Sequence, residues 1–242
     1  MADEKLPFTA HLEELRKRLI VCFITIAVGF IASYFFSKRI FDILMQPLLE
    51  ALPPKGSLIF TGLTEAFITY LKVSLLAGVF AASPVILYQI WSFISPGLYE
   101  KEKKYAFPFV FFSTIFFIGG ALFGYFAVFP FGFRFFMSFA SETIVPLPSI
   151  KEYLAFSTKL LFAFGIVFEL PLFVFFLTKI GVVNAEMLSS QRKYALIMVF
   201  VFSAILTPPD VISQLMMAGP LLLLYELSVW VARMVGKKEE SS

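Results

Sequence analysis

The sequence predicts an all-α membrane protein with six transmembrane helices and both termini in the cytoplasm. Of its 242 residues, 59% are hydrophobic and 15% are charged, and the mean hydropathy is +0.86. A soluble globular domain averages about 45–50% apolar and about 25% charged residues. Six charge-poor runs follow one another along the chain, and Lys and Arg are divided unequally between the segments that join them. These observations exclude a disordered chain and make a soluble single domain a poor interpretation.

A helix needs roughly 20 mostly apolar residues to cross the hydrocarbon layer. Within a single polytopic domain of residues 1–242, the predicted spans are about 19–37, 67–93, 105–133, 155–178, 194–208 and 211–230. A short amphipathic stretch at 40–52 lies in the connection after the first span.

The last two spans differ from the others in length. Their uncharged runs, Tyr194–Pro209 and Val211–Tyr225, have only 16 and 15 residues. At 1.5 Å per residue such runs reach only about 23–24 Å. Helices five and six are therefore expected to be short, and a tight Pro-Pro-Asp turn joins them.

The distribution of basic residues predicts the orientation. Thirteen of the 20 Lys and Arg residues lie in the termini and in the connections after the second and fourth spans, against seven elsewhere. The positive-inside rule then places both termini in the cytoplasm. Ser37-Lys38-Arg39 follows the first apolar run in place of a small-residue cleavage site, so this run is expected to be a retained span.

Three prolines, Pro84, Pro171 and Pro220, fall inside predicted spans. Proline removes one backbone hydrogen bond and bends a helix. Three kinked helices favour a curved or concave arrangement over a straight bundle.

Glu169 lies at the middle of the fourth apolar run, two residues before Pro171. A charged group at this depth costs at least roughly 2.5–3.5 kcal/mol, so its side chain should face protein or water. One interpretation is a protonated Glu169 that clamps neighbouring helices. The other is a site for a polar or cationic group, which is favoured because intramembrane ionisable residues usually serve function.

Two acidic segments are predicted on the cytoplasmic face. In the N-terminal segment, Glu13–Lys17 and Glu14–Arg18 have the i,i+4 spacing of helical ion pairs. The connection after the second span carries Glu100 and Glu102. By themselves these residues favour solvated, self-paired segments, but two acidic clusters could also hold a basic ligand through Arg–carboxylate contacts.

Polar residues also gather at the turn between the last two spans. Asp210 and Gln214 share one helix face, and Thr207 lies across the turn. Turn chemistry is the favoured interpretation, and a docking place for another helix is the alternative.

The sequence predicts neither an enzyme nor a cofactor site. Cys22 and His11 are the only residues of their types, so a disulfide framework and a multi-histidine metal site are excluded. No catalytic motif is present. Nothing indicates nucleic-acid binding.

Four motifs, in order, resemble the TatC family, the multispanning receptor of the twin-arginine protein translocation pathway. They are His11-Leu12-x-Glu14-Leu15-Arg16-Lys17-Arg18, Phe93-x-x-Pro96-Gly97-Leu98-Tyr99 with Glu102, Phe168-Glu169-x-Pro171, and Leu206-Thr207-Pro208-Pro209-Asp210-x-x-Ser213-Gln214. The resemblance covers the chain from residue 11 to about residue 230.

The resemblance implies a curved, glove-like fold in the cell inner membrane and a role in Sec-independent export of folded proteins, driven by the proton-motive force. It implies that Glu14 and Glu102 bind the arginine pair of the signal peptide, with Arg16 and Phe93 in the same site. Because Glu13 adjoins Glu14, either carboxylate can be the partner of the arginines.

The resemblance also implies partners within the membrane. Glu169 would face an intramembrane pocket, and Thr207, Asp210 and Gln214 would dock single-span TatA- or TatB-type subunits. Self-association within a larger translocase in the lipid bilayer is expected. The alternative function is a proton-coupled small-solute carrier with Glu169 as its proton-carrying acid, although the repeat symmetry of such carriers is not found.

Overall fold

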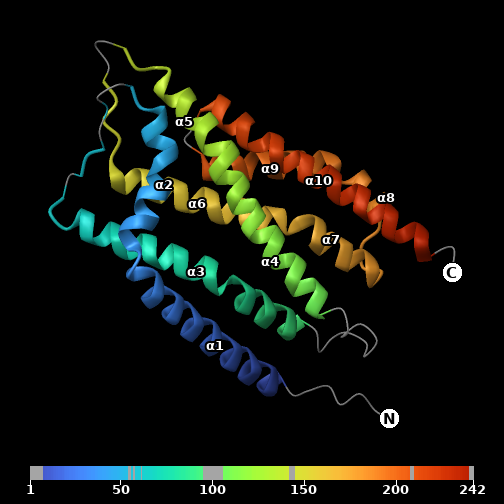
Figure 1. Ribbon diagram of the computed structural model, residues 1–242. Helices are drawn as coiled ribbons and strands as arrows, with labels where there is room; N and C mark the ends of the chain where they lie inside the picture. The colour runs from blue at the N-terminus through green and yellow to red at the C-terminus, as the bar shows by residue number, and fades with distance from the viewer. Residues whose placement is uncertain are drawn as a thin grey trace. The chain divides into compact units, whose positions relative to one another are not determined.

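The computed structural model describes residues 8–53, 56, 58–60, 62–94, 106–141, 145–207 and 210–239. Over these residues the chain is helical, with a single isolated bridge between Ile59 and Ser149 as its β feature, so the predicted all-α class is confirmed. The helices (Figure 1) are α1 Phe8–Tyr34, α2 Ser37–Ala51, α3 Glu65–Ile94, α4 Ala106–Phe123, α5 Phe129–Met137, α6 Ile150–Phe168, α7 Leu170–Lys179, α8 Ala185–Ser190, α9 Arg192–Leu206 and α10 Val211–Glu239, with a π-helical turn, η3 Gly124–Val128, between α4 and α5.

Four helical segments among the described residues are long and apolar enough to cross a membrane: Glu65–Phe93, Pro108–Met137, Ile150–Lys179 and Val211–Gly236. They coincide with the predicted second, third, fourth and sixth spans. The first predicted span lies in α1. Together with α2 it is apolar enough for a fifth candidate span, but the two helices are bent by 86° relative to each other. The predicted fifth span corresponds to α9, which has 15 residues. The count of six and the orientation of the termini stay predictions.

Two of the long segments are interrupted next to a proline. The N–H of Phe129 donates to the carbonyl of Gly124, five residues back, directly before Pro130. A proline has no N–H to continue the ladder, and the wider π turn carries the chain past it. In the fourth segment α6 ends at Phe168 and α7 begins at Leu170, just before Pro171. Pro84 and Pro220, in contrast, lie inside α3 and α10 without ending either helix.

The sixth helix is longer than its apolar run predicts. α10 has 29 residues and continues past Glu226, where the uncharged run stops. Glu226 does not end the helix because glutamate is a good helix former; its carboxylate accepts two hydrogen bonds from Arg192 at the start of α9, at 2.7 and 2.9 Å. The expectation of a short sixth helix is therefore wrong, because a charged residue ends an apolar run without ending a helix. The helix α9 is short as expected.

The chain divides into two compact units. The first unit comprises Met1–Asp42 and Phe67–Ile115. In it α1 and α3 meet through two glycines: a Cβ added to Gly78 would lie 2.6 Å from the backbone nitrogen of Phe30, and one on Gly29 would lie 2.7 Å from the carbonyl oxygen of Gly78. Only glycine permits backbones this close, as at other membrane helix contacts.

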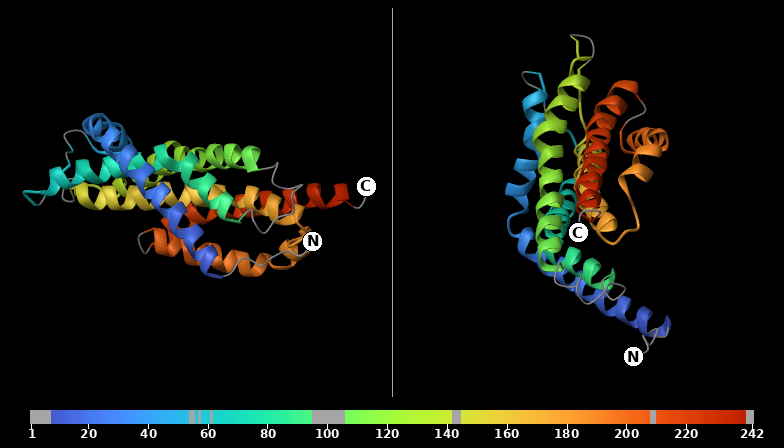
Figure 2. Two further views of the ribbon diagram at one scale, coloured as in Figure 1. Left: turned by 90° about the horizontal axis from the view of Figure 1, so that it is seen from below. Right: turned by 90° about the vertical axis from the view of Figure 1, so that its right-hand side faces the viewer.

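The second unit comprises Ile43–Ala66 and Phe116–Ser242. Here α10 packs against α7 and α9, and the right-hand view of Figure 2 shows α9 beside α10. Phe129 and Phe164 are fully buried in its core. The C-terminal half of α2 is fastened to this core because the hydroxyl of Tyr153 donates to the Leu44 carbonyl at 2.6 Å.

Glu65 ties two connections of the second unit together. Its Oε2 accepts the N–H of Gly62 at 3.2 Å, and its Oε1 accepts the N–H of Lys151 in the first turn of α6 at 3.0 Å. Next to this contact, Ile59 and Ser149 form the isolated bridge. A buried carboxylate thus caps α6 from outside that helix, where the helix dipole also favours a negative charge.

Candidate functional site

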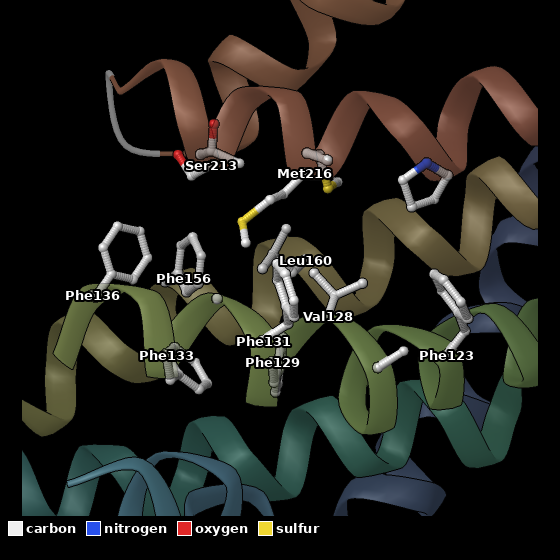
Figure 3. A pocket seen from close by; sticks show the side chains of 15 residues that line it. Phe123, Val128, Phe129, Phe131, Phe133, Phe136, Phe156, Leu160, Ser213 and Met216 are labelled. Carbon is white, nitrogen blue, oxygen red and sulfur yellow. The ribbon is translucent and has the colours of Figure 1, made fainter. Parts of the chain in front are cut away.

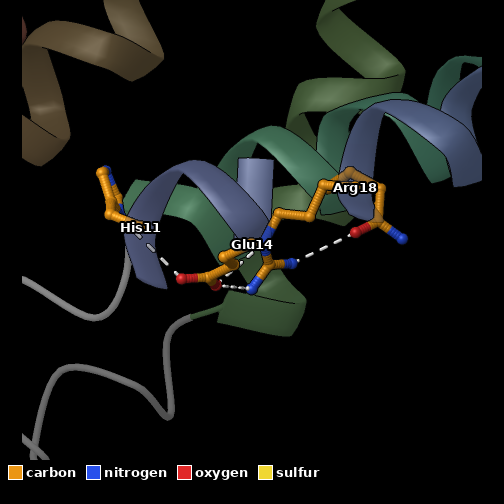
Figure 4. A network of polar contacts seen from close by, with 4 residues as sticks. His11, Glu14 and Arg18 are labelled. Carbon is orange, nitrogen blue, oxygen red and sulfur yellow. Dashed lines mark hydrogen bonds and ion pairs between the residues drawn. The ribbon is translucent and has the colours of Figure 1, made fainter. Parts of the chain in front are cut away.

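The first unit contains a polar cluster built on α1 and α3 (Figure 4). Glu14 and Arg18, one helical turn apart on α1, form a close ion pair in which Nε of Arg18 donates to Oε1 of Glu14 at 3.0 Å and Nη2 donates to the same oxygen. Nη1 of Arg18 donates to Oε1 of Gln89 on α3 at 3.1 Å. The guanidinium therefore connects the two helices while it neutralises the carboxylate.

His11 and Phe93 border the same cluster. Nδ1 of His11 lies 3.9 Å from Oε2 of Glu14, the oxygen that Arg18 does not contact. The His11 ring stacks on the Phe93 ring with centroids 4.3 Å apart and an interplanar angle of 18°. The structure thus brings Phe93, a predicted site residue near the end of α3, to the same end of α1 as Glu14.

The two neighbouring acids of α1 have different environments. The Glu13 side chain is 63% exposed and pairs with Lys17, itself 72% exposed, at 2.9 Å. The Glu14 side chain is only 26% exposed. Arg16 is exposed and lies two residues from both Glu14 and Arg18, a spacing at which helical side chains do not face each other. Glu102 lies in 95–105, outside the described residues.

Glu169 lies in the second unit, at the interruption between α6 and α7. Its N–H donates to the Ile166 carbonyl at 3.1 Å, and its own carbonyl accepts the N–H of Phe173 at 2.8 Å. The residue is half-buried. The predicted mid-span acid therefore stands at a break in the helix and not within a regular turn.

The three polar residues of the last turn have partners within the chain. Oδ1 of Asp210 accepts the N–H of Ser213 at 2.7 Å, and Oδ2 accepts its hydroxyl. Thr207 donates its hydroxyl to the Ser203 carbonyl at 2.8 Å, and Nε2 of Gln214 donates to the Phe200 carbonyl on α9 at 3.0 Å. These contacts cap α10, complete α9 and join the two helices.

A pocket lined by apolar side chains lies beside this turn (Figure 3). Phe131 and Phe136 of α5, Phe156 of α6 and Met216 of α10 line it, and Ser213 lies at its edge. Sequence reasoning did not find this pocket. The signal available was the group of phenylalanines at 129, 131, 133, 135 and 136, whose spacing places aromatic side chains on more than one face of a helix.

Comparisons with known proteins bear on these sites. The family model described as "Sec-independent protein translocase protein (TatC)" matches residues 10–220. The chain is 54% identical over 239 residues to a Sec-independent protein translocase protein TatC of Desulforapulum autotrophicum, covering 99% of this chain and 88% of the relative. The chain belongs to the TatC family.

Other relatives agree with this membership. A TatC protein of Magnetococcus marinus is 46% identical over 236 residues, which cover 98% of this chain and 87% of that one. A crystal structure of a twin-arginine translocase receptor, TatC, matches with a TM-score of 0.83 and 42% identity over 93% of this chain and 99% of that chain. The recognised resemblance is thereby confirmed.

Membership of the TatC family fixes the general role of the chain. It is a multi-pass membrane protein and a component of the Sec-independent protein translocase, not an enzyme. Other subunits of that translocase are its partners. The alternative of a proton-coupled small-solute carrier is not favoured.

One residue of the polar cluster was not anticipated. Gln89 is 71 residues from Arg18 in sequence, and it carries no charge that would have marked it. The Glu14–Arg18 pair was predictable because its spacing is local, whereas the contact with Gln89 depends on how α1 and α3 pack through their glycines.

Proposed function

We propose that this chain is the translocase subunit that binds twin-arginine signal peptides, and that Glu14 and Glu102 accept the two arginines. The observation that carries the proposal is the environment of Glu14. Its carboxylate is half-buried, lies next to an aromatic pair and already holds a guanidinium. A carboxylate that binds the guanidinium of Arg18 can bind the guanidinium of a peptide arginine by the same hydrogen bonds.

The chemistry explains why arginine would be required. A guanidinium presents several donors in a fixed plane and matches a carboxylate with two parallel hydrogen bonds. Lysine offers a compact point charge on a flexible stem and cannot form this planar pair. Glu14 is a better candidate than Glu13, because partial burial strengthens an ion pair and full exposure weakens it.

The neighbouring residues have distinct roles in this proposal. Phe93, stacked on His11, forms an apolar edge beside the carboxylate against which the peptide backbone or an apolar side chain can lie. Arg16, exposed on another part of α1, repels basic residues outside the arginine pair. Both roles orient the peptide at the cytoplasmic face of the inner membrane, where the two termini also lie.

Single-span TatA- or TatB-type subunits are the proposed partners in the membrane. The family likeness supports docking at Thr207, Asp210 and Gln214, next to the phenylalanine-lined pocket. Glu169 is the proposed intramembrane polar contact of the translocase. The energy for transport comes from the proton-motive force.

The test is a double charge reversal, Glu14→Lys with Glu102→Lys, in the purified protein. Binding of a labelled Arg-Arg signal peptide should fall at least about 100-fold, because each reversal replaces a charge-assisted hydrogen bond with repulsion. Fluorescence anisotropy in detergent measures the affinity.

A matched double variant, Glu13→Lys with Glu100→Lys, controls for the change in net charge. It should retain most of the affinity, because it alters the same two segments by the same charge. If the first variant binds the peptide as tightly as the unmodified protein, or if both variants lose binding equally, the assignment to Glu14 and Glu102 is wrong.

A further inference from the structure

A polar pocket of about 510 Å³ lies in the second unit between α8 and the C-terminal part of α10 (Figure 1). Asn184, Glu186 and Ser189 line this α8–α10 pocket on one side, and Arg233 and Gly236 line it on the other. Its volume is typical of sites that hold a small molecule. No residue assigned above to signal-peptide binding or to subunit docking lines it, so it is a separate site.

Two hydrogen bonds join the walls of the α8–α10 pocket. The hydroxyl of Tyr225 donates to the Leu188 carbonyl at 2.7 Å, and Nη2 of Arg233 donates to the hydroxyl oxygen of Ser189 at 3.3 Å. Glu186 and Ser189 are three residues apart on α8, a spacing at which helical side chains are neighbours. The carboxylate of Glu186 and the guanidinium of Arg233 therefore border the same space.

This pocket offers one cation and one carboxylate that can bind a ligand. A guanidinium has five N–H donors, and the bond to Ser189 is the only hydrogen bond that Arg233 makes among the described residues. Glu186 is exposed, and no residue in the described part of the chain forms an ion pair with it. The neighbouring Arg192 and Glu226 already pair with each other, so together they add little net charge.

The α8–α10 pocket lies where two membrane-crossing segments end. The segment Val211–Gly236 ends at a residue that lines the pocket, and Ile150–Lys179 ends shortly before Asn184. Trp230, which is 58% exposed, lies one helical turn before Arg233. Tryptophan is enriched where spans meet lipid headgroups. This position places the pocket at headgroup level, on the side that the distribution of basic residues predicts to be cytoplasmic.

We propose that the α8–α10 pocket binds the headgroup of an aminophospholipid, with the phosphate on Arg233 and Ser189 and the primary ammonium on Glu186. Charge-assisted hydrogen bonds from a guanidinium to a phosphate are among the strong ones. Basic pockets between membrane helices on the cytoplasmic side are a known form of headgroup site. The binding involves no covalent change, and it does not depend on the proposed recognition of signal peptides.

The carboxylate of Glu186 discriminates among phospholipids. A primary ammonium has N–H donors for this carboxylate, whereas the net negative charge of phosphatidylglycerol is repelled by it. The trimethylated ammonium of phosphatidylcholine has no N–H donor, and such groups are usually held by aromatic faces. No aromatic side chain is among the described residues that line the pocket. Phosphatidylethanolamine is therefore the preferred ligand, both by attraction and by the cost imposed on the other two lipids.

Native mass spectrometry of the purified protein in detergent measures the affinity for the first bound molecule of each of these three lipids, all with the same acyl chains. The unmodified protein should bind phosphatidylethanolamine most tightly. In Arg233→Gln the affinities for phosphatidylethanolamine and phosphatidylglycerol should both fall about two- to fivefold, the range for loss of one exposed ionic contact. In Glu186→Gln only the affinity for phosphatidylethanolamine should fall, so the preference over phosphatidylglycerol is lost.

Further variants control for general effects. Lys193→Gln removes an exposed cation that does not line the pocket and should leave all three affinities unchanged. Gly236→Leu extends a side chain into the pocket without a change of charge, because a Cβ there meets nothing within 4 Å, and should weaken binding of phosphatidylethanolamine. Gly219→Leu makes the same substitution at another open position of α10 and should not weaken it.

The inference is wrong if neither Arg233→Gln nor Glu186→Gln changes the affinity for phosphatidylethanolamine. It is equally wrong if the unmodified protein binds phosphatidylethanolamine and phosphatidylcholine with the same affinity. Phosphoethanolamine without acyl chains, added at the same concentration as the lipid, should not displace it. Displacement would show that the pocket takes a water-soluble phosphate ester and would overturn the assignment to a membrane lipid.

Discussion

At the start of α10, both carboxylate oxygens of Asp210 accept hydrogen bonds from Ser213, one from its N–H and one from its hydroxyl. The first turn of a helix has backbone N–H groups without helical partners, and an aspartate before that turn satisfies one of them. The spacing of Asp210 and Gln214 in the sequence predicted that they share one helix face, and turn chemistry was the favoured interpretation. The hydrogen bond from Gln214 to the Phe200 carbonyl on α9 could not be predicted, because it depends on the packing of two helices.

Asp210→Ala should destabilise the protein by about 0.5–2 kcal/mol, the usual cost of removing an N-cap side chain. Asp210→Asn keeps a side-chain oxygen for the Ser213 N–H and should cost less. Thermal unfolding of both variants in the same detergent measures the difference. Equal stability of Asp210→Ala and the unmodified protein would show that the cap contributes nothing there.

Among the elements, α1 and α3 meet through a close backbone approach, whereas α9 and α10 pack together and are also joined by an exposed ion pair. Isolated glycines give little indication in a sequence of which partner they will meet, so the Gly29–Gly78 contact was not predictable. The break at Pro171 was located correctly, since a proline cannot continue the ladder. The similar prolines Pro84 and Pro220 end no helix, which shows that a proline alone does not fix a break.

Gly78→Ala should separate α1 from α3 and destabilise the protein by about 1–3 kcal/mol, the range for overpacking a tight contact. The clashing atoms are backbone atoms of Gly29 and Phe30, which no side-chain rotation can move. Gly119→Ala is the matched control, because a Cβ there meets nothing within 4 Å. Denaturant-induced unfolding, followed by circular dichroism, measures the stability of both variants. Equal stability of Gly78→Ala and Gly119→Ala would contradict this prediction.

Arg192→Ala, which removes the ion pair between α9 and α10 at Glu226, should destabilise the protein less than Gly78→Ala does. Both side chains are about half exposed, so water screens their interaction. The hydrogen bond to Glu226 raises the pKa of the Arg192 guanidinium, which keeps it charged. A loss of stability larger than that of Gly78→Ala in the same unfolding assay would reverse this ranking.

For the whole molecule, composition was sufficient for the fold class and for the approximate position of four membrane-crossing segments. It was insufficient for the length of α10, because the end of an apolar run at Glu226 does not mark the end of a helix. The unequal distribution of Lys and Arg predicts the orientation, which a labelling experiment can decide.

Single cysteines are introduced at Ala2, Gly56 or Ser241, each together with Cys22→Ala. Their reactivity should show which side of the membrane each position faces. An impermeant thiol reagent added to intact cells should label Gly56→Cys alone, because the first connection between spans is predicted outside. Ala2→Cys and Ser241→Cys should react only after the membrane is opened. Labelling of one terminus in intact cells would contradict an even number of spans with both ends in the cytoplasm.

The central claim is recognition of an arginine pair by the carboxylates of this chain, and the most direct test is one comparison of affinities. A labelled Arg-Arg signal peptide and its Lys-Lys version are titrated into the purified, unmodified protein, with and without a single-span partner subunit. A clear preference for the Arg-Arg peptide is the predicted result. Equal binding of the two peptides, or no binding even with the partner present, would contradict the account.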